Sequence, residues 1–506
     1  MTRSEFLRCL AYGAAAAITG SLHAAQRSAR QRLPNIVFIL ADDLGYGDPV
    51  FLNAKSRIRT PNLERMAAEG LVFTDAHAPS AVCTPTRYSV MTGRYCWRSP
   101  LKAGVLAGGS PPLIEPGRMT VASLLKQNGY ATACVGKWHL GLDWVTSDGK
   151  AAEDAMANVD FTKPFGRGPT TLGFDYYYGI SASLDMPPYI YLENDRATEL
   201  PTSVTQGEPR MPRNWRLGPL APGFKHQQVL PRLTEKAAGW IDGWAKQESG
   251  KPFFLYLALN APHTPVLPLE EFKGRTGAGD YGDFVAEVDW TVGQILDAVR
   301  RAGAAGNTLV IVTSDNGPEN IAYERAREYQ HYSMGDLRGV KRDLWEGGHR
   351  VPFLARWPGK VRPGTVSGEI VCLTDLMATC ADIVHARLPD SAGEDSYSIL
   401  PALLGRKLAR PIREATVLHS AQGRLAIRQG PWLFIDHPTG DNNREPEWFK
   451  KERHYEPHQF TGELYNLRDD LPERKNLYGE RQDVVRKLKA LLERYKAEGR
   501  SAPGKR

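Results

Sequence analysis

Short apolar runs alternate with amphipathic segments along most of the chain. A continuous apolar run bounded by turn residues is typical of a strand that is buried on both faces. Four such runs are Asn35–Leu40, Ala131–Val135, Phe253–Leu259 and Thr308–Thr313. The segments with helical periodicity between them are Pro61–Glu69, Val121–Asn128, Leu233–Lys246 and Phe284–Arg301. This alternation predicts an α/β fold with a large, mainly parallel sheet flanked by helices.

The pattern changes around Leu404–Ile412. Short strand-like segments follow, namely Thr416–His419, Arg424–Arg428, Trp432–Ile435 and Glu463–Asn466. Asp483–Ala497 then has the periodicity of one charged amphipathic helix. We therefore predict a large domain over residues 33–409. Residues 410–506 are expected to form a smaller α+β domain with antiparallel strands and a terminal helix.

Composition and charge exclude several classes of protein. The chain has 506 residues, of which 42% are hydrophobic and 24% charged, so disorder, a collagen-like chain and a multi-span membrane protein do not describe it as a whole. The net charge of +7 lies mostly at the ends, because residues 1–32 contribute +4 and Lys505 and Arg506 contribute +2. The remaining +1 gives no reason to expect a nucleic-acid partner.

The first residues have the features of an export signal. Arg3 and Arg8 are basic, Cys9–Ile18 is a short apolar run, and Ser21–Ala25 contains small residues suited to cleavage. We predict that residues 1–25 are a signal peptide and that the protein is exported, to the periplasm or the extracellular space. The apolar run is too short for a stable membrane span. The alternative is a poorly ordered N-terminal helix of a cytosolic protein.

Six cysteines are few for a secreted scaffold that depends on disulfides. Cys9 lies in the predicted signal, and Cys83 belongs to a motif considered below. The other four could form at most two disulfides, and their spacing does not select a pairing. They are Cys96, Cys134, Cys372 and Cys380.

Polar residues follow each of the four predicted buried strands directly. The segments are Ala41–Gly45, Gly136–His139, Asn260–His263 and Ser314–Gly317. A single segment of this kind is more often a solvated turn or a helix cap. Parallel strands, however, would bring all four to the same edge of the sheet, where ligands bind in open α/β folds. We therefore predict a functional site at this edge.

The acidic and amide residues at that edge offer hard oxygen ligands. They are Asp42, Asp43, Asp315 and Asn316. Oxygen ligands suit Ca²⁺ or Mg²⁺, and three neighbouring carboxylates would repel one another unless a cation lay among them. Lys137 and Lys341 add fixed positive charge, while His139 and His263 can exchange protons near neutral pH. Together these groups predict a pocket for an oxyanion.

Cys83 is a candidate for the nucleophile that this pocket otherwise lacks. Cys83-Thr84-Pro85-Thr86-Arg87, followed by Met91-Thr92-Gly93-Arg94, resembles the signature of the formylglycine-dependent (type I) sulfatases of the alkaline-phosphatase superfamily. Two other interpretations of Cys83 remain open. It could be an inert buried cysteine at the start of a helix that ends at Gly93, or a thiolate nucleophile stabilised by the helix dipole and Arg87.

The resemblance extends from about Asn35 to Asn476 and includes Glu463-Leu464-Tyr465-Asn466-Leu467. It implies an alkaline-phosphatase-like fold and a sulfuric ester hydrolase. It also implies that a formylglycine-generating maturation enzyme oxidises Cys83 to 3-oxoalanine (formylglycine), whose hydrate attacks sulfur. The resulting sulfo-enzyme intermediate would then be resolved by C–O cleavage.

The resemblance further assigns roles residue by residue. One Ca²⁺ ion would be bound by Asp42, Asp43, Asp315, Asn316 and the modified Cys83. Arg87 would hold the aldehyde hydrate, and Lys137 and Lys341 would bind sulfate oxygens. His139 resembles the base that collapses the sulfated intermediate, and His263, with Lys341, the acid that serves the leaving oxygen. Ser183 aligns with a supporting serine in the substrate-binding group.

The substrate is less well defined by the sequence. The motifs are most similar to the arylsulfatase A and N-acetylgalactosamine-6-sulfatase types, which favours a sulfated glycan over a small aryl sulfate. Three aromatic-rich segments, interpreted as long connections, could line a sugar site or simply pack, and they are Phe174–Tyr178, Pro187–Tyr191 and Asn214–Trp215. The alternative functions are a phosphate or phosphonate monoesterase of the same superfamily and a non-catalytic glycan-binding protein.

Overall fold

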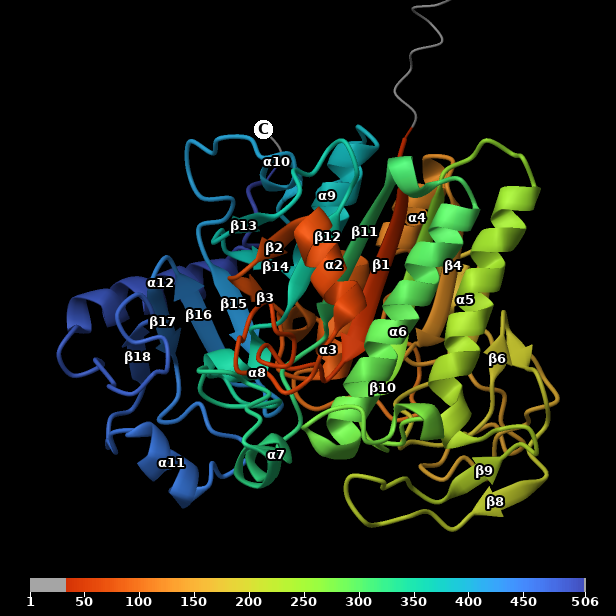
Figure 1. Cartoon of the computed structure of the whole chain (residues 1–506), viewed down its shortest axis with the longest axis horizontal. Coiled ribbons are helices and arrows are strands. Elements are labelled where there is room, and N and C mark those ends of the chain that lie inside the picture. Colours follow the sequence, from red (N-terminus) through yellow and green to blue (C-terminus); the bar gives the residue numbers. More distant parts are fainter. Residues whose placement is uncertain (1–32, 505–506) are drawn as a thin grey trace, which may run out of the picture. The chain divides into compact units, whose positions relative to one another are not determined.

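In the computed structural model, which describes residues 33–504, five parallel strands form the centre of a ten-stranded sheet (Figure 1). The order of the sheet is β13 (Thr365–Ser367), β2 (Leu71–Phe73), β12 (Phe353–Arg356), β11 (Thr308–Ser314), β1 (Asn35–Asp42), β10 (Phe253–Pro262), β4 (Ala131–Lys137), β5 (Tyr176–Ile180), β6 (Leu192–Glu193) and β7 (Arg196–Ala197). The central strands β11, β1, β10, β4 and β5 are parallel, while antiparallel pairs join β11 to β12, β12 to β2, β5 to β6 and β6 to β7. The predicted fold class is confirmed.

Helices cover both faces of the sheet (Figure 1). One face carries α2 (Pro61–Glu69), α5 (Val229–Lys246) and α6 (Gly279–Arg301), and the other carries α3 (Cys83–Thr92), α4 (Val121–Gln127) and α9 (Leu376–Ile383). Every residue of β1 and β10 is buried, because helices on both faces shield these strands from water. This explains why the central strands read as continuous apolar runs.

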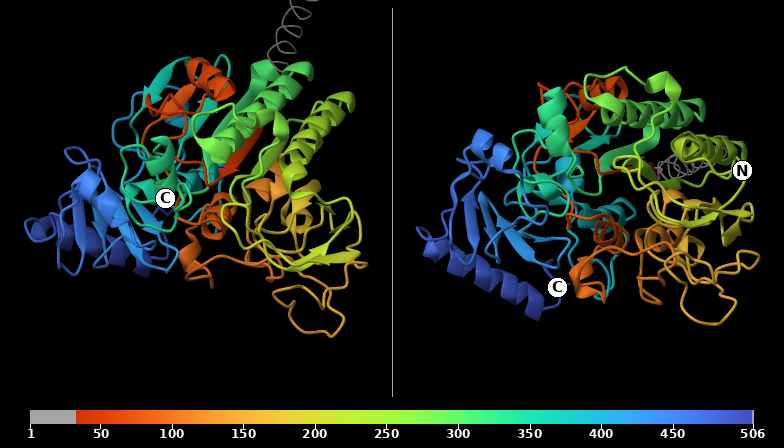
Figure 2. Two further views of the ribbon diagram at one scale, coloured as in Figure 1. Left: turned by 60° about the horizontal axis from the view of Figure 1, so that its bottom comes forward. Right: turned by 90° about the horizontal axis from the view of Figure 1, so that it is seen from below.

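The C-terminal part of the chain forms a separate four-stranded antiparallel sheet. Its strands are β15 (Thr416–His419), β16 (Leu425–Gln429), β17 (Trp432–Ile435) and β18 (Glu463–Asn466). The amphipathic helix α12 (Gln482–Ala497) lies along this sheet and contacts β16 and β17 (Figure 2). Its buried apolar side chains, such as Leu488 and Leu492, pack against Ile427 and Phe434. All four predicted strands and the terminal helix are therefore present.

Shorter elements connect these layers. They are β3 (Ala76–His77), β8 (Ser203–Thr205), β9 (Gly218–Leu220), β14 (Val371–Cys372), α7 (Ala322–Tyr329), α8 (Glu346–His349), α10 (Leu400–Leu403) and α11 (Glu447–Arg453). Residues Asn35–Arg506 form one compact unit, so the proposed domain boundary at residues 409/410 stays a prediction. The predicted signal peptide lies outside the described residues. None of the described helices is long and apolar enough to cross a membrane.

The five cysteines at described positions are buried and free of disulfides. Cys134 lies within β4, Cys372 within β14 and Cys380 within α9. Burial raises the pKa of the Cys380 thiol, as it does for Cys134. These three cysteines therefore act as small apolar side chains in the core.

Gly136 provides a test of the close strand packing that positions the end of β4. Its φ is +117°, and a Cβ atom there would lie 1.8 Å from the carbonyl oxygen of Ala258 on β10. We expect Gly136→Ala to lower the free energy of unfolding by about 2–3 kcal/mol, because both the backbone conformation and the strand spacing would have to change. Urea unfolding of the purified protein measures this loss.

Gly239→Ala is the matched control. Gly239 is exposed in the middle of α5 and a Cβ there would meet no atom within 4 Å. The same substitution should raise the free energy of unfolding by about 0.5–1 kcal/mol, because alanine favours the helix. Equal effects at the two positions would contradict the packing described here.

Candidate functional site

The central strands carry their polar residues at one edge of the sheet. Asp42 is the last residue of β1, Lys137 of β4 and Ser314 of β11. Asn260, expected just after a strand, lies within β10. The strands extend beyond the apolar runs because parallel pairing continues through these polar residues, as in the pairing of Ala41 with Ser314. The predicted convergence of the four segments on one site is present in the structure.

Each of the three carboxylates at this edge forms an ion pair with a different cation. The pairs are Asp42 with Lys137 (2.6 Å), Asp43 with Lys341 (2.8 Å) and Asp315 with Arg87 (2.7 Å). All six residues are buried. The sequence argument that the carboxylates need a divalent cation to relieve their repulsion is therefore incomplete, because these three side chains already compensate their charges.

The pKa values of two carboxyl groups diverge in this environment. Burial acts to raise the pKa of Asp42, but the nearby cations, Lys137 foremost, hold it well below its ordinary value. Burial and the charge of Asp42 raise the pKa of Asp315 to about 6, even though Arg87 opposes the shift. Of these two carboxyl groups, Asp42 therefore keeps its negative charge to lower pH than Asp315 does.

Two oxygen atoms in this cluster have no hydrogen-bond partner. They are Asp42 Oδ1 and Asn316 Oδ1, and both are buried. Asn316 is oriented by its amide, which donates a hydrogen bond of 2.7 Å to Asp43 Oδ1. Buried oxygens without a donor are costly unless a ligand satisfies them. An all-oxygen donor set with two such atoms fits a hard divalent cation.

Cys83 lies beside this oxygen cluster as the first residue of α3. Its sulfur and carboxylate oxygens of Asp42 and Asp315 all lie within 4.8 Å of one another. Arg87 follows one helical turn later and donates hydrogen bonds to Asp315 Oδ2 and to the carbonyl oxygen of Lys137. The helix ends at Gly93, whose φ of 65° is left-handed, as the motif predicts.

The environment of Cys83 disfavours a thiolate nucleophile. Burial raises the pKa of the Cys83 thiol, and the opposing effects of Lys137 and Lys341 do not reverse this shift. A thiol with a raised pKa is neutral near pH 7, whereas the reactive form of cysteine is the thiolate. Cys83 nevertheless lines a cavity of about 630 Å³, so the residue is accessible to a small ligand.

Ser183 joins Lys137 to His263. Lys137 Nζ donates a hydrogen bond of 3.0 Å to Ser183 Oγ, which lies 3.3 Å from the ring nitrogens of His263. His263 Nδ1 donates to the carbonyl oxygen of Thr264 at 2.6 Å, because a carbonyl can only accept. His263 Nε2 lies 3.7 Å from Asp43 Oδ2. The structure thus brings the predicted serine, lysine and histidine together.

His139 is buried near the cations of the site. It follows β4 with a left-handed φ of 56°, and its Nε2 donates to the carbonyl oxygen of Leu106 at 2.7 Å. Its Nδ1 has no hydrogen-bond partner. Burial and the charges of Lys137 and Arg87 hold the pKa of His139 well below its ordinary value. The ring is therefore neutral near pH 7, with the Nδ1 lone pair available as a base.

The cavity beside Cys83 also contains polar residues that the sequence motifs did not identify. They are Asp185, Arg216, Glu319, Asn442 and Asn443. Glu319 pairs with Arg342 and lies 3.6 Å from Lys341, while the Asn443 amide donates to the Lys341 carbonyl. Glu319 lies three residues after Asn316, and this proximity to the Asp315-Asn316 segment is a sequence signal for a place in the site. Asn442 and Asn443 belong to a distant loop, and no motif marks them.

The aromatic-rich segments do not line this cavity. Tyr176–Ile180 is strand β5 of the large sheet, not part of a connection. Tyr189 and Trp215 pack against His226. Their ring centroids lie 4.7 and 4.5 Å, respectively, from that of His226. Of the three segments, only Asn214 contributes to the cavity wall. The aromatic side chains of these segments therefore act in packing, which was the second of the two interpretations.

Comparisons with known proteins agree with this arrangement. A family model described as Sulfatase matches residues 34–386. The chain is 32% identical over 504 residues to an N-acetylgalactosamine-6-O-sulfatase of Bacteroides thetaiotaomicron, covering 92% of this chain and 93% of the relative. It is 36% identical over 380 residues to Arylsulfatase A of Homo sapiens, covering 74% and 68%. A solved structure from work on glycosaminoglycan metabolism by Bacteroides thetaiotaomicron matches with a TM-score of 0.78 and 31% identity, covering 92% of this chain and 100% of that one.

Replacement of Lys137 tests whether the buried ion pairs are required for stability. Lys137→Met removes the charge that faces Asp42 while keeping a similar side-chain length. We expect the free energy of unfolding to fall by about 3–5 kcal/mol, because a buried carboxylate would lose its partner. Replacing Asp42 by Asn in the same protein should recover part of this loss. Denaturant unfolding curves measure both changes.

Lys126→Met is the control for this experiment. Lys126 pairs with Asp175 at 2.7 Å, nearly the same distance, but about half of each side chain is exposed. Removal of this surface pair should cost less than about 1 kcal/mol. If the two lysine variants lose the same small amount of stability, the buried pairs do not have the structural role assigned to them.

Proposed function

The chain belongs to the sulfatase family, and on this premise we propose that it hydrolyses sulfate esters of a glycan by means of a formylglycine generated from Cys83. As a member of this family it is a sulfuric ester hydrolase. The observation that carries the finer proposal is the position of Cys83. It begins α3 between Asp42 and Asp315 and opens into the cavity that Lys341 and His263 also line.

The oxygen cluster would hold one Ca²⁺ ion through Asp42, Asp43, Asp315 and Asn316, together with an oxygen of the modified Cys83. The unpartnered Asp42 Oδ1 and Asn316 Oδ1 support this assignment. Such an ion supplies positive charge next to the nucleophile and the sulfate group. The other ligands stay oriented through their own contacts, since Arg87 holds Asp315 and Lys341 holds Asp43.

Lys137 and Lys341 bind the sulfate oxygens in this proposal. Both ammonium groups are buried and each is anchored to a carboxylate, so their charge is fixed in position before substrate arrives. Fixed charge in a site that excludes water stabilises the additional negative charge of a transition state more than mobile charge does. Arg87, which is held by Asp315 one helical turn after residue 83, would hold the aldehyde hydrate.

A formylglycine hydrate offers two hydroxyl groups on one carbon, one to attack sulfur and one whose deprotonation later expels sulfate by C–O cleavage. His263 holds one N–H at Nδ1, bonded to the Thr264 carbonyl, so a proton taken up at Nε2 is the one it would give to the leaving alcohol oxygen. His139 accepts the second proton at Nδ1, which has no partner and belongs to a neutral ring. Ser183 supports Lys137 and His263.

A sulfated glycan fits the cavity because the wall opposite Cys83 is polar. Asp185 Oδ1 and Asn214 Oδ1 are buried without hydrogen-bond partners, and sugar hydroxyl groups are donors that would satisfy them. The names of the relatives favour a 6-O-sulfated N-acetylgalactosamine unit. A formylglycine-generating enzyme is the maturation partner that this chemistry requires, and export to the periplasm or the extracellular space completes the proposal.

Modification of Cys83 tests the nucleophile directly. In protein produced together with a formylglycine-generating enzyme, the tryptic peptide Met66–Arg87 should carry oxygen in place of sulfur and two hydrogens fewer at residue 83. Cys83→Ala should abolish turnover. Cys83→Ser should be slow and accumulate covalently bound sulfate, because a serine ester has no second hydroxyl on the same carbon. Mass spectrometry and turnover assays measure both effects.

Cys380→Ala provides the control, since Cys380 is also buried in a helix but is distant in sequence from the site motifs. This variant should retain turnover. An unmodified thiol in fully active protein, or multiple turnover by Cys83→Ser at the rate of the unsubstituted protein, would exclude the formylglycine mechanism and leave the family assignment intact.

The leaving group and the sugar can be tested with paired substrates. Sulfate and phosphate esters of the same phenol should differ in kcat/KM in favour of sulfate, as expected for a member of the sulfatase family. Among glycans, the 6-O-sulfate of N-acetylgalactosamine should be cleaved faster than its 4-O-sulfate isomer. Faster phosphate cleavage would favour the phosphatase alternative, and binding without cleavage of any ester would favour a glycan-binding protein.

A further inference from the structure

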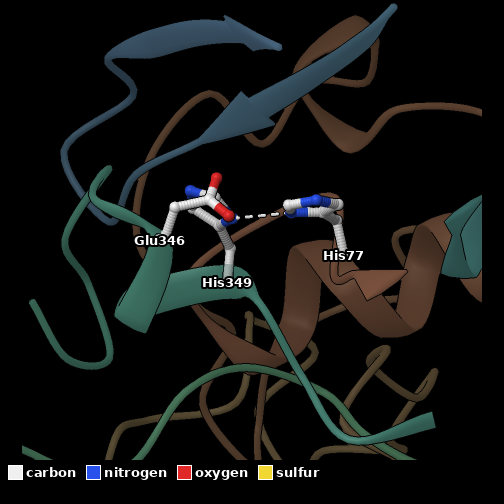
Figure 3. Close-up of side chains that lie close together, drawn as sticks. All are labelled: His77, Glu346 and His349. Carbon is white, nitrogen blue, oxygen red and sulfur yellow. Dashed lines mark hydrogen bonds between the residues drawn. The ribbon is translucent and has the colours of Figure 1, made fainter. Parts of the chain in front are cut away.

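A second cluster of potential metal ligands lies outside the candidate site. His77 is the last residue of β3, and Glu346 and His349 are the first and last residues of α8. One potential ligand atom from each of the three lies within 4.8 Å of the others, and all three residues are 0% exposed. Figure 3 shows the two imidazole rings facing each other, with the Glu346 carboxylate beside the His349 ring.

The hydrogen bonds made by the two Nε2 atoms indicate that the facing Nδ1 atoms carry no hydrogen. His77 Nε2 lies 2.7 Å from Asp75 Oδ1, and His349 Nε2 lies 3.0 Å from the carbonyl oxygen of Leu344. A carbonyl and an ionised carboxylate only accept, so each Nε2 carries the ring's hydrogen. In neutral rings, both Nδ1 atoms then present lone pairs to each other, although they are 3.2 Å apart.

A bound cation resolves this conflict. Two nitrogen ligands about 2.0–2.1 Å from a tetrahedral Zn²⁺ are separated by about 3.3 Å, close to the spacing of the two Nδ1 atoms. Metal-ligating histidines also characteristically donate their second N–H to a carboxylate or a backbone carbonyl. His77 donates to the carboxylate of Asp75, and His349 donates to the carbonyl oxygen of Leu344.

Glu346 supplies the third ligand atom. Its Oε2 accepts a hydrogen bond of 2.9 Å from Arg350, whereas its Oε1 is buried and has no hydrogen-bond partner. The nearest cation recorded for Oε1 is Arg428 Nε, at 3.8 Å, beyond hydrogen-bond distance. Glu346 thus has a carboxylate oxygen left to bind an ion, and with the two imidazole nitrogens it would make a donor set of two nitrogens and one oxygen.

Acidic and basic side chains surround the cluster. Asp75, Glu346 and Glu473 are acidic, and Glu473 Oε2 accepts a hydrogen bond of 2.9 Å from the Glu346 amide. Arg350 pairs with Asp75 and Glu346, and Arg428 pairs with Asp75. Burial raises the pKa of Glu473 well above its ordinary value, so Asp75 and Glu346 alone face the charges of Arg350 and Arg428, and these four side chains balance.

We propose that His77, Glu346 and His349 bind one transition-metal ion of the Zn²⁺ class, at a site separate from the oxygen cluster of the candidate active site. Two imidazoles and one carboxylate are a ligand set that Zn²⁺ accepts and Ca²⁺ does not prefer. The ligands come from two segments that pair through a bridge between His77 and Arg350. The ion therefore fastens these segments together.

The place of these segments in the chain gives the ion a positioning role. His77 precedes Cys83 by six residues, and Glu346 follows Lys341 by five. Fixing His77 to Glu346 and His349 holds together the backbone that leads into α3 and the backbone that leaves Lys341. Asp75, Arg350 and Arg428, which pair with one another and with Glu346 beside the cluster, line a cavity of about 1,340 Å³.

The test uses Zn²⁺ and Co²⁺ with the full chain, purified without a histidine tag, stripped with a chelator and kept in excess Ca²⁺. The unsubstituted protein should bind one Zn²⁺ per chain by elemental analysis, and Co²⁺ should give the intense visible absorption of a tetrahedral site. His349→Gln and Glu346→Gln should each weaken Zn²⁺ binding by at least tenfold. Tenfold is roughly the effect of losing a residue that hydrogen-bonds to a metal ligand, and loss of a ligand itself should weaken binding at least as much. Glu346→Gln keeps an oxygen that can accept from Arg350, so its fold is the less perturbed of the two.

His331→Gln is the matched control. His331 is also buried and its Nε2 also lies against a carboxylate, that of Asp48 at 2.9 Å, but it belongs to no cluster of potential ligands among the described residues. This variant should bind Zn²⁺ as tightly as the unsubstituted protein. Absence of Zn²⁺ binding by the unsubstituted protein would overturn the proposal and indicate a proton shared by the two rings. Equal binding by the unsubstituted protein and Glu346→Gln would overturn it as well. Both outcomes are independent of the modification of Cys83.

Discussion

The structure depends on the mutual neutralisation of three buried carboxylates and three buried cations at the edge of the large sheet. Removing six charges from water is unfavourable, and only close pairing offsets that cost. Asp42 ends β1 and Lys137 ends β4, two strands with β10 between them, while Arg87 comes from helix α3. The sheet and its helices must therefore be assembled correctly before the charges can balance, and the balanced charges in turn give the site a fixed electric field.

Backbone geometry adds a second constraint at the same edge. Asp43, His139 and Arg342 all have left-handed φ values, which are uncommon for residues other than glycine. All three belong to the ion-pair network or lie close to it in sequence: Asp43 is a member, Arg342 directly follows Lys341, and His139 lies two residues after Lys137. Unfavourable backbone conformations persist only where surrounding contacts determine them. The turns after the strands are therefore shaped for the placement of side chains.

The sequence predicted what depends on local pattern and short motifs. The apolar runs identified β1, β4, β10 and β11, and the Cys83 motif identified α3 with its end at Gly93. It did not predict contacts between distant residues, such as the bond from Lys341 to Asp43, 298 positions away, or from Asn443 to Lys341. The contact between His77 and His349 was not predicted for the same reason, because no local pattern in either segment indicates that the two histidines meet.

The wall of the cavity has two origins within the chain. Cys83, Lys341 and His263 come from the region of the large sheet, whereas Asn442 and Asn443 come from the connection between β17 and β18 of the C-terminal sheet. The groups proposed to bind the sulfate are thus carried by one part of the fold, and part of the surface proposed to meet the rest of the substrate is carried by another. Divergence in the β17–β18 connection could alter the preferred sugar while leaving the chemical step untouched, so selectivity and reactivity are free to evolve separately in this scaffold.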